Sequence, residues 1–211
     1  MNVIVKRTGI IAVAFISYYL FAKFGLLFAI PPGFASTIWP AAGIGLALYL
    51  IAGPWALVGV YGGAYLSNFE VASQKMEVLG VDAFQIPFFV ATSSVLFMVV
   101  AKWLLHRYCQ LPANATNLKS ILKFLALMGP VACLTSSLIS ATAISVLNDL
   151  SLSNWAFIAF TWWIGDLLGV IFFTPILLAL FKNDYYANRR ERFKIAIPAL
   201  ILFIIVTAMF S

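Results

Sequence analysis

The chain has 211 residues, of which 64% are apolar and only 9% are charged. Soluble domains carry roughly 25% charged residues, so this composition excludes a water-soluble globular fold. One bilayer crossing needs about 20 apolar residues, and the composition predicts an all-α membrane bundle of about seven transmembrane segments, with no room for a kinase, cyclase or other output module. The net charge of +6 is interpreted against the membrane, and no nucleic-acid partner is expected.

Charges and Pro/Gly pairs divide the chain into seven apolar stretches, 8–30, 36–53, 54–68, 83–104, 119–147, 154–181 and 193–211. Such continuous runs predict helices, because a barrel would show alternating segments of about 10 residues. The first run is longer than the apolar region of a signal peptide, so it is expected to remain as a membrane helix. The second and third runs break at Gly53-Pro54, and two interpretations stay open: two short crossings or one re-entrant hairpin.

Positive charges gather on one side of the predicted bundle. If the N-terminus is cytoplasmic, the outer side receives only Lys75. The cytoplasmic side receives Lys6, Arg7, Lys102, Arg107, Lys119, Lys123, Lys182, Arg189, Arg190, Arg192 and Lys194. This asymmetry predicts a multi-pass protein with a cytoplasmic N-terminus, in contact with membrane lipids. The last run would then end outside, so we expect residues 1–211 to be a single domain truncated before a final helix; a natural outward end is the alternative.

The first helix carries Lys23, a cation within an apolar run. Two outcomes are open for this side chain. It pairs with Asp166 of the sixth stretch, which lies roughly 8 Å deeper at 1.5 Å per residue, or its long stem extends to the outer surface.

The second helix is expected to begin near Ser36 and Thr37, whose hydroxyls can cap its first amides. Pro40 fits the first turn, where a missing N–H costs nothing. Trp39 is either an ordinary interfacial residue or part of the wall of an outward-facing cavity, with the positive end of the helix dipole available to an anion. Gly43 follows one turn later in the motif Trp39-Pro40-Ala41-Ala42-Gly43.

The third to fifth helices supply small and polar side chains. Gly59 and Gly63 form a GxxxG face, which is typical of close helix packing. Asn68 is either a loop residue or part of a site, and Pro130 is expected to kink the fifth helix. Hydroxyls on the fourth and fifth helices are either interhelical hydrogen-bond partners or the polar wall of a cavity. They are Thr92, Ser93, Ser94, Thr135, Ser136, Ser137, Ser140, Thr142 and Ser145.

Asp166 is the most informative residue, because it lies near the middle of the 154–181 run. A carboxylate at that depth costs about 2.5–3.5 kcal/mol on insertion scales, so it should face the bundle interior and a partner. Two roles are weighed evenly: binding a polar ligand or proton, and tying helices together through hydrogen bonds. Gly165 and Gly169 flank it at a small-xxx-small spacing that lets another backbone approach. Trp162 and Trp163 precede it by one turn.

No catalytic set or metal site is predicted. Cys109, Cys133 and the single His106 are too few for a zinc cluster, a disulfide framework or a bis-histidine haem site. There is no phosphate-binding glycine loop, and one carboxylate without a second acid or nucleophile offers no mechanism. We therefore expect no cofactor, no metal and no enzyme activity in this chain.

Three elements together resemble the type-one membrane-associated sensor (MASE) domain of bacteria. They are the motif from Trp39 to Gly43, the segment from Gly59 to Asn68, and the run from Trp162 to Gly169 followed by Thr174-Pro175. The resemblance implies a sensory input domain of the bacterial inner membrane, typically with about eight helices. It also implies a C-terminal histidine kinase, diguanylate cyclase or phosphodiesterase module, and hence two-component or cyclic di-GMP signalling.

The preferred hypothesis is a sensory domain whose outward-facing cavity binds a small ligand or a membrane partner protein. The candidate residues are Trp39, Pro40, Gly43, Asn68, Trp162, Trp163 and Asp166. Two alternatives remain: a substrate-binding membrane subunit of a small-molecule transporter, and a structural anchor in which the small-residue faces form a homodimer.

Overall fold

The structure is a computed structural model, and it describes residues 3–30, 35–36, 38–75, 82–109, 127–181 and Ile197. The predicted all-helical fold is confirmed, apart from a pair of two-residue strands. The long elements are α1 (Val3–Leu26), α2 (Pro40–Ala52), α3 (Trp55–Lys75), α4 (Asp82–Leu104), α6 (Cys133–Leu147) and α7 (Leu152–Phe181). Shorter ones are β1 (Ala29–Ile30), β2 (Ala35–Ser36) and the π-helical turns η1 (Leu105–Cys109) and η2 (Leu127–Ala132).

Within the described residues, four helical segments are long and apolar enough to cross a membrane: Val3–Leu26, Ala83–Tyr108, Gly129–Leu147 and Leu152–Phe181. They match four of the predicted stretches. The seventh stretch, 193–211, lies outside the described residues except for Ile197, so the predicted count of about seven is not tested over its full length.

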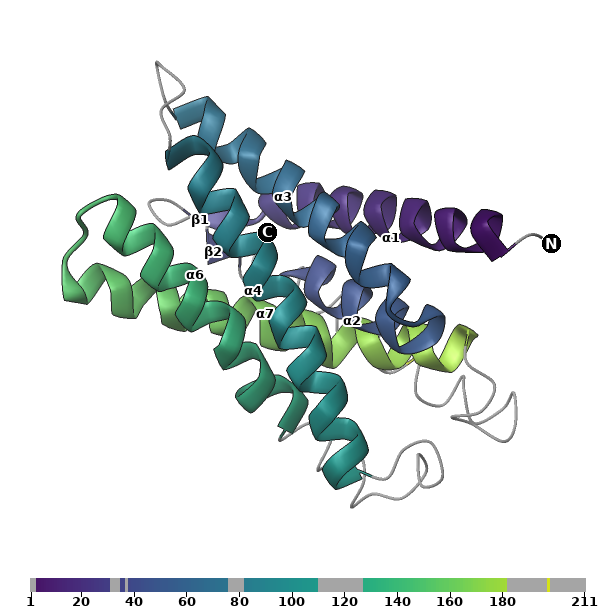
Figure 1. The fold of residues 1–211 in the computed structure, drawn as a ribbon. Helices are drawn as coiled ribbons and strands as arrows, with labels where there is room; N and C mark the ends of the chain where they lie inside the picture. The colour runs from purple at the N-terminus through teal and green to yellow at the C-terminus, as the bar shows by residue number, and fades with distance from the viewer. Residues whose placement is uncertain are drawn as a thin grey trace.

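The helices of the described part alternate in direction along one axis (Figure 1). The antiparallel β1–β2 hairpin, the start of α4 and the α6–α7 turn lie at one end, which we call the hairpin end. The first residues of α1, the α2–α3 turn at Gly53 and the last turns of α4 and α7 lie at the opposite, N-terminal end. Chain direction therefore reverses at each connection, as the sequence predicts for consecutive crossings.

Helix α2 is the centre of the bundle, and none of its residues is exposed. It has 13 residues, so its length is about 20 Å and falls short of a hydrocarbon core of about 30 Å. It contacts α1, α3, α4 and α7. The break at Gly53, where φ is +86°, turns the chain into α3, so α2 and α3 are two separate antiparallel helices, of which α2 is too short to cross alone.

The start of α2 differs from the prediction. The expected cap by Ser36 is wrong, because its hydroxyl donates to the Ile38 carbonyl (2.6 Å), and no side chain of the described residues caps the helix. Thr37 lies outside the described residues. Pro40 occupies the first turn as predicted. The backbone stays non-helical through Trp39 because the Trp39 N–H donates to the Gly165 carbonyl of α7 (2.9 Å).

Helices α1 and α3 are in backbone contact over the predicted GxxxG face. A Cβ atom on Gly59 would overlap the Ile11 carbonyl oxygen, and one on Gly63 would lie 2.9 Å from the Phe15 carbonyl oxygen. Helix α3 also continues seven residues beyond the apolar stretch 54–68. Its polar last turns remain helical, and Glu70 on them makes contacts with α1 that are described below.

Candidate functional site

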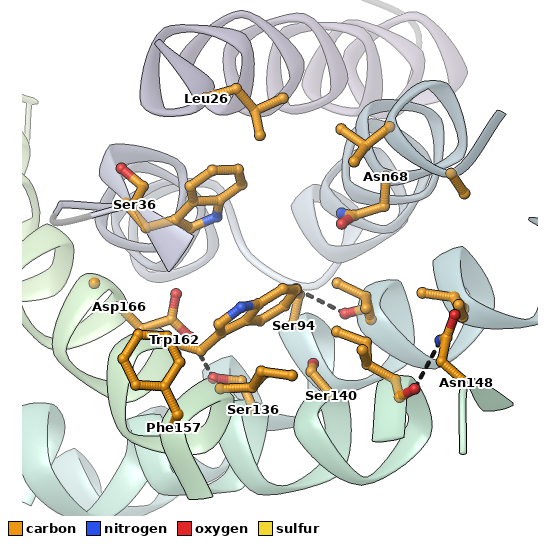
Figure 2. A pocket seen from close by; sticks show the side chains of 18 of the residues that line it. Leu26, Ser36, Asn68, Ser94, Ser136, Ser140, Asn148, Phe157, Trp162 and Asp166 are labelled. Carbon is orange, nitrogen blue, oxygen red and sulfur yellow. Dashed lines mark hydrogen bonds between the residues drawn. The ribbon is translucent and has the colours of Figure 1, made fainter. Parts of the chain in front are cut away.

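A cavity of about 410 Å³ lies between the helices toward the hairpin end. Residues of α1, β2, α3, α4, α6 and α7 line it, together with Trp39 directly before α2. Figure 2 shows Asp166 and Trp162 of α7 across the cavity from Asn68 of α3, with Ser136 and Ser140 of α6 below. The cavity brings together Trp39, Asn68, Trp162 and Asp166, four of the seven candidate residues.

The base of this cavity is a backbone contact between the two motifs that the sequence singled out. A Cβ atom on Gly169 would overlap the Trp39 carbonyl oxygen, and one on Gly43 would overlap the Gly169 carbonyl oxygen. A Cβ atom on Gly165 would lie 2.6 Å from the Ser36 carbonyl oxygen. Only glycine allows this approach, so the spacing of small residues on α7 positions the segment that enters α2.

A side chain on α7 fixes the same contact from the other direction. The buried Thr174 hydroxyl donates to the Gly43 carbonyl oxygen (2.9 Å), across 131 residues of sequence. Pro175 follows directly, and a proline cannot donate to the carbonyl one turn before it. Pro40 and Gly43 are both buried below the cavity and do not line it. Of the candidate residues, Pro40 and Gly43 therefore position the contact between α2 and α7 and do not form the cavity wall.

Asp166 is buried at 9% exposure on the cavity wall. The Ser136 hydroxyl of α6 donates to its Oδ2 atom. Within the described residues no hydrogen-bond donor reaches its Oδ1 atom. The carboxylate is thus tied to one neighbouring helix through one oxygen, and both roles weighed from the sequence, ligand contact and helix contact, stay open for it.

Hydroxyls of α1, α4 and α6 continue the polar wall. The Tyr18 hydroxyl donates to Ser94 Oγ (3.3 Å), and the Ser93 and Ser140 hydroxyls are 2.8 Å apart. Tyr18, Ser94, Ser136 and Ser140 all line the cavity. These groups therefore serve both of the functions that the sequence left open: they join helices and they form a polar surface.

The two tryptophans before Asp166 point in different directions. Trp162 lines the cavity, one turn before Asp166 on the same helix face. Trp163 does not line it and instead donates its indole N–H to the Pro130 carbonyl oxygen (2.9 Å) in the π-helical turn before α6. Trp163 thereby stabilises the irregular turn that Pro130 was expected to cause.

Lys23 has a different partner from the one that the sequence suggested. Its ammonium group donates to Glu70 Oε2 (2.6 Å) on α3, and the Tyr19 hydroxyl donates to Glu70 Oε1 (2.7 Å). The Lys23–Asp166 pair does not form, because Glu70 is nearer on the extended α3 and Asp166 bonds to Ser136. The hydrogen bonds from Lys23 and Tyr19 hold the pKa of Glu70, which lies beyond the apolar stretch, below its usual value.

Sequence reasoning missed several lining residues. Tyr18 of α1, and Ile86 and Val90 of α4, belong to the wall, but they are apolar or aromatic side chains in mostly apolar runs and do not stand out there. Asn148 and Asn154, on either side of the α6–α7 turn, line the cavity at the hairpin end. A signal for these two exists, since Asn148 directly follows the stretch that contains Ser136 and Asn154 begins the stretch that contains Asp166. No group of metal-ligating side chains occurs in the part of the chain that the structure describes.

One comparison with known proteins identifies the family of the chain. A family model, MASE1, matches residues 11–211, which include all the elements of the motif contact and the cavity. No curated protein and no solved structure matches the chain. The resemblance inferred from the sequence is confirmed, and the family, together with the four long apolar helices among the described residues, indicates a multi-pass membrane protein. The chain therefore belongs to the MASE1 family, the membrane-associated sensory domains of signalling proteins.

Proposed function

We propose that this chain is a sensory input domain of the bacterial inner membrane that binds a small ligand or a membrane partner in the cavity beside Asp166. Residues 1–211 act in it as a single domain, and occupancy is relayed to an output module of the same signalling protein. The observation that carries the proposal is the carboxylate of Asp166, buried on a cavity wall inside an apolar bundle. Ionisable groups at such depth are expensive to bury and usually serve a function.

The orientation of the domain in the membrane is inferred from the distribution of its positive charges. Lys6, Arg7, Lys102 and Arg107 belong to the N-terminal end of the bundle. The positive-inside rule favours that end as the cytoplasmic one. The hairpin end then faces outward, and with it the cavity. A ligand would enter from outside, on the side opposite to any cytoplasmic output.

The relay rests on the contact between α2 and α7. A ligand against Trp39 or Asp166 touches the two segments that meet backbone to backbone at Gly43 and Gly169. Packed backbones do not deform gradually, so a displacement at the cavity would move α2 and α7 together. Helix α7 spans 30 residues and ends at the N-terminal end, which links the cavity to the cytoplasmic side.

The test uses the full-length signalling protein in membranes, with its output activity as the readout. Ile144→Trp fills the cavity from α6. Val146→Trp places the same indole on the outer face of that helix, where the Val146 side chain is 70% exposed. We expect the first substitution to change output and abolish its response to stimulus, and the second to leave both unaltered. Equal output from both variants and the parent protein would contradict the proposal.

A further inference from the structure

The described residues that line the cavity carry negative charge and no positive charge. Among the described residues that line it, Asp166 is the sole acidic side chain, and there is no lysine, arginine or histidine. The cation of the first apolar run, Lys23, pairs with Glu70, and neither residue lines the cavity. An anionic ligand would meet the carboxylate with no compensating positive charge, so the cavity disfavours anions.

The dipole of α2 does not reverse that preference. One of the two sequence interpretations of Trp39 offers the N-terminus of this helix to an anion. In the structure the Trp39 N–H is used by the Gly165 carbonyl and the Ala42 N–H is 3.1 Å from the Trp39 carbonyl oxygen, while Pro40 has no N–H. Pro40, Ala41 and Ala42 are all buried below the cavity. No amide of the first turn is therefore offered to a ligand.

Two features favour a cation instead. The Oδ1 atom of Asp166 accepts no hydrogen bond from the described residues, which leaves it available to a ligand donor. Two indoles, Trp162 one turn before Asp166 and Trp39 beside Gly165, line the same cavity. A carboxylate next to aromatic faces is the combination that binds ammonium groups, because the ring quadrupole attracts positive charge.

The rest of the wall sets the shape of such a ligand. Apolar side chains such as Val90, Ile144 and Phe157 line the cavity together with neutral hydroxyls and amides. A volume of about 410 Å³ lies in the range of cavities for small organic molecules. A bare inorganic cation would leave this apolar wall without a partner, whereas an amine with an apolar or aromatic body would cover it.

We propose that the cavity takes a small organic amine in its protonated form, with the ammonium group on Asp166 and the apolar body against Trp39 and Trp162. This inference rests on the proposed function, because it names the ligand class of the same cavity. It assigns to Asp166 the role of charge recognition, and to Ser136 the role of orienting the carboxylate through Oδ2.

The experiment measures binding to the purified chain in nanodiscs, by equilibrium dialysis against three probes that share a phenyl body. They are phenethylamine as the cation, 2-phenylethanol as the neutral analogue and phenylacetate as the anion; empty nanodiscs give the partitioning background. We expect the amine to bind at least tenfold more tightly than the alcohol, and the anion to bind most weakly. Asp166→Asn should remove that tenfold preference while the alcohol still binds, which also reports that the variant is folded.

Two further variants separate charge recognition from a structural role. Asp166→Glu keeps the charge and should retain the preference for the amine. Asp149→Asn removes an exposed carboxylate from the α6–α7 turn, where φ is +49° and asparagine is tolerated, and should change amine affinity by less than twofold.

The proposal is overturned if the amine and the alcohol bind equally to the parent chain, or if Asp166→Asn keeps the preference for the amine. It is also overturned if no probe binds or the anion binds best. In each of these cases the output test with Ile144→Trp decides separately on the proposed function. A loss of stimulus response there would retain a sensing cavity with a different ligand class, and an unaltered response would refute both.

Discussion

Gly169→Ala tests the backbone contact between α7 and the segment that enters α2. The added Cβ atom would overlap the Trp39 carbonyl oxygen and lie 2.8 Å from the Trp39 carbonyl carbon, with Pro40 N at 3.5 Å. All three are backbone atoms next to a buried helix start, so none can rotate away. Overpacking of a core costs about 1–3 kcal/mol, and rigid neighbours place this case near the upper end. We expect a loss of about 3 kcal/mol, roughly a hundredfold in the folding equilibrium, since 1.4 kcal/mol is a factor of ten.

The assay is reversible unfolding of the purified chain in mixed micelles, followed by tryptophan fluorescence. Gly9→Ala is the matched control, because a Cβ atom there meets nothing within 4 Å and the site is inside α1. This control should be neutral or up to about 1 kcal/mol more stable, because alanine favours a helix over glycine. If the Gly169 variant is as stable as the Gly9 variant, the two backbones are not in contact and the proposed relay loses its basis.

Three further predictions concern residues outside the cavity base. Trp163→Phe should cost about 1 kcal/mol in the same unfolding assay, because the Pro130 carbonyl loses its indole donor. The lowered pKa of Glu70 means that its bond to Lys23 stabilises the fold above the usual glutamate pKa and is lost as pH falls below it. Acidification from pH 7 to pH 3 should therefore destabilise the parent chain more than it destabilises the Glu70→Gln variant. The difference should be at most about 1 kcal/mol, because the pair is partly exposed and solvent weakens it. A cysteine at the 79% exposed Leu152, in a chain without its native cysteines, should react with an impermeant thiol reagent added outside intact cells; labelling only after lysis would reverse the orientation.

Hydropathy predicted the helices well but not their polar ends. The stretches 83–104 and 154–181 correspond closely to α4 and α7, because apolar length alone defines a crossing. Helix α3 was predicted to end at residue 68 but continues to Lys75. Its last turns are polar, and a hydropathy pattern ends where polarity begins even if hydrogen bonding continues. Glu70 lies on those last turns, outside the predicted stretch 54–68, so the sequence did not indicate it as the partner of Lys23.

The candidate site was predictable in its polar members and not in its apolar ones. Asp166 and Trp162 stand out in the sequence because a carboxylate inside an apolar run has few explanations. Val90 does not stand out, because in a membrane helix the face toward lipid and the face toward protein are equally apolar. The Trp163 side chain points toward the π-helical turn at Pro130, to which it donates a hydrogen bond, and no local sequence pattern in α7 predicts that partner.

The enclosure of α2 has a consequence for how the membrane itself acts on this domain. Bilayers of different thickness are matched by tilting or by local deformation, and only elements in contact with lipid experience that mismatch. Helix α1 has a broad exposed apolar face, including Val13, Ile16 and Leu20, whereas α2 has no exposed residue. Lipid composition therefore reaches α2 only through the tilt of its neighbours. The partner of α2 at the cavity base, α7, does have exposed side chains such as Phe160 and Leu180, so bilayer thickness acts on the cavity base through α7 and not on α2 directly.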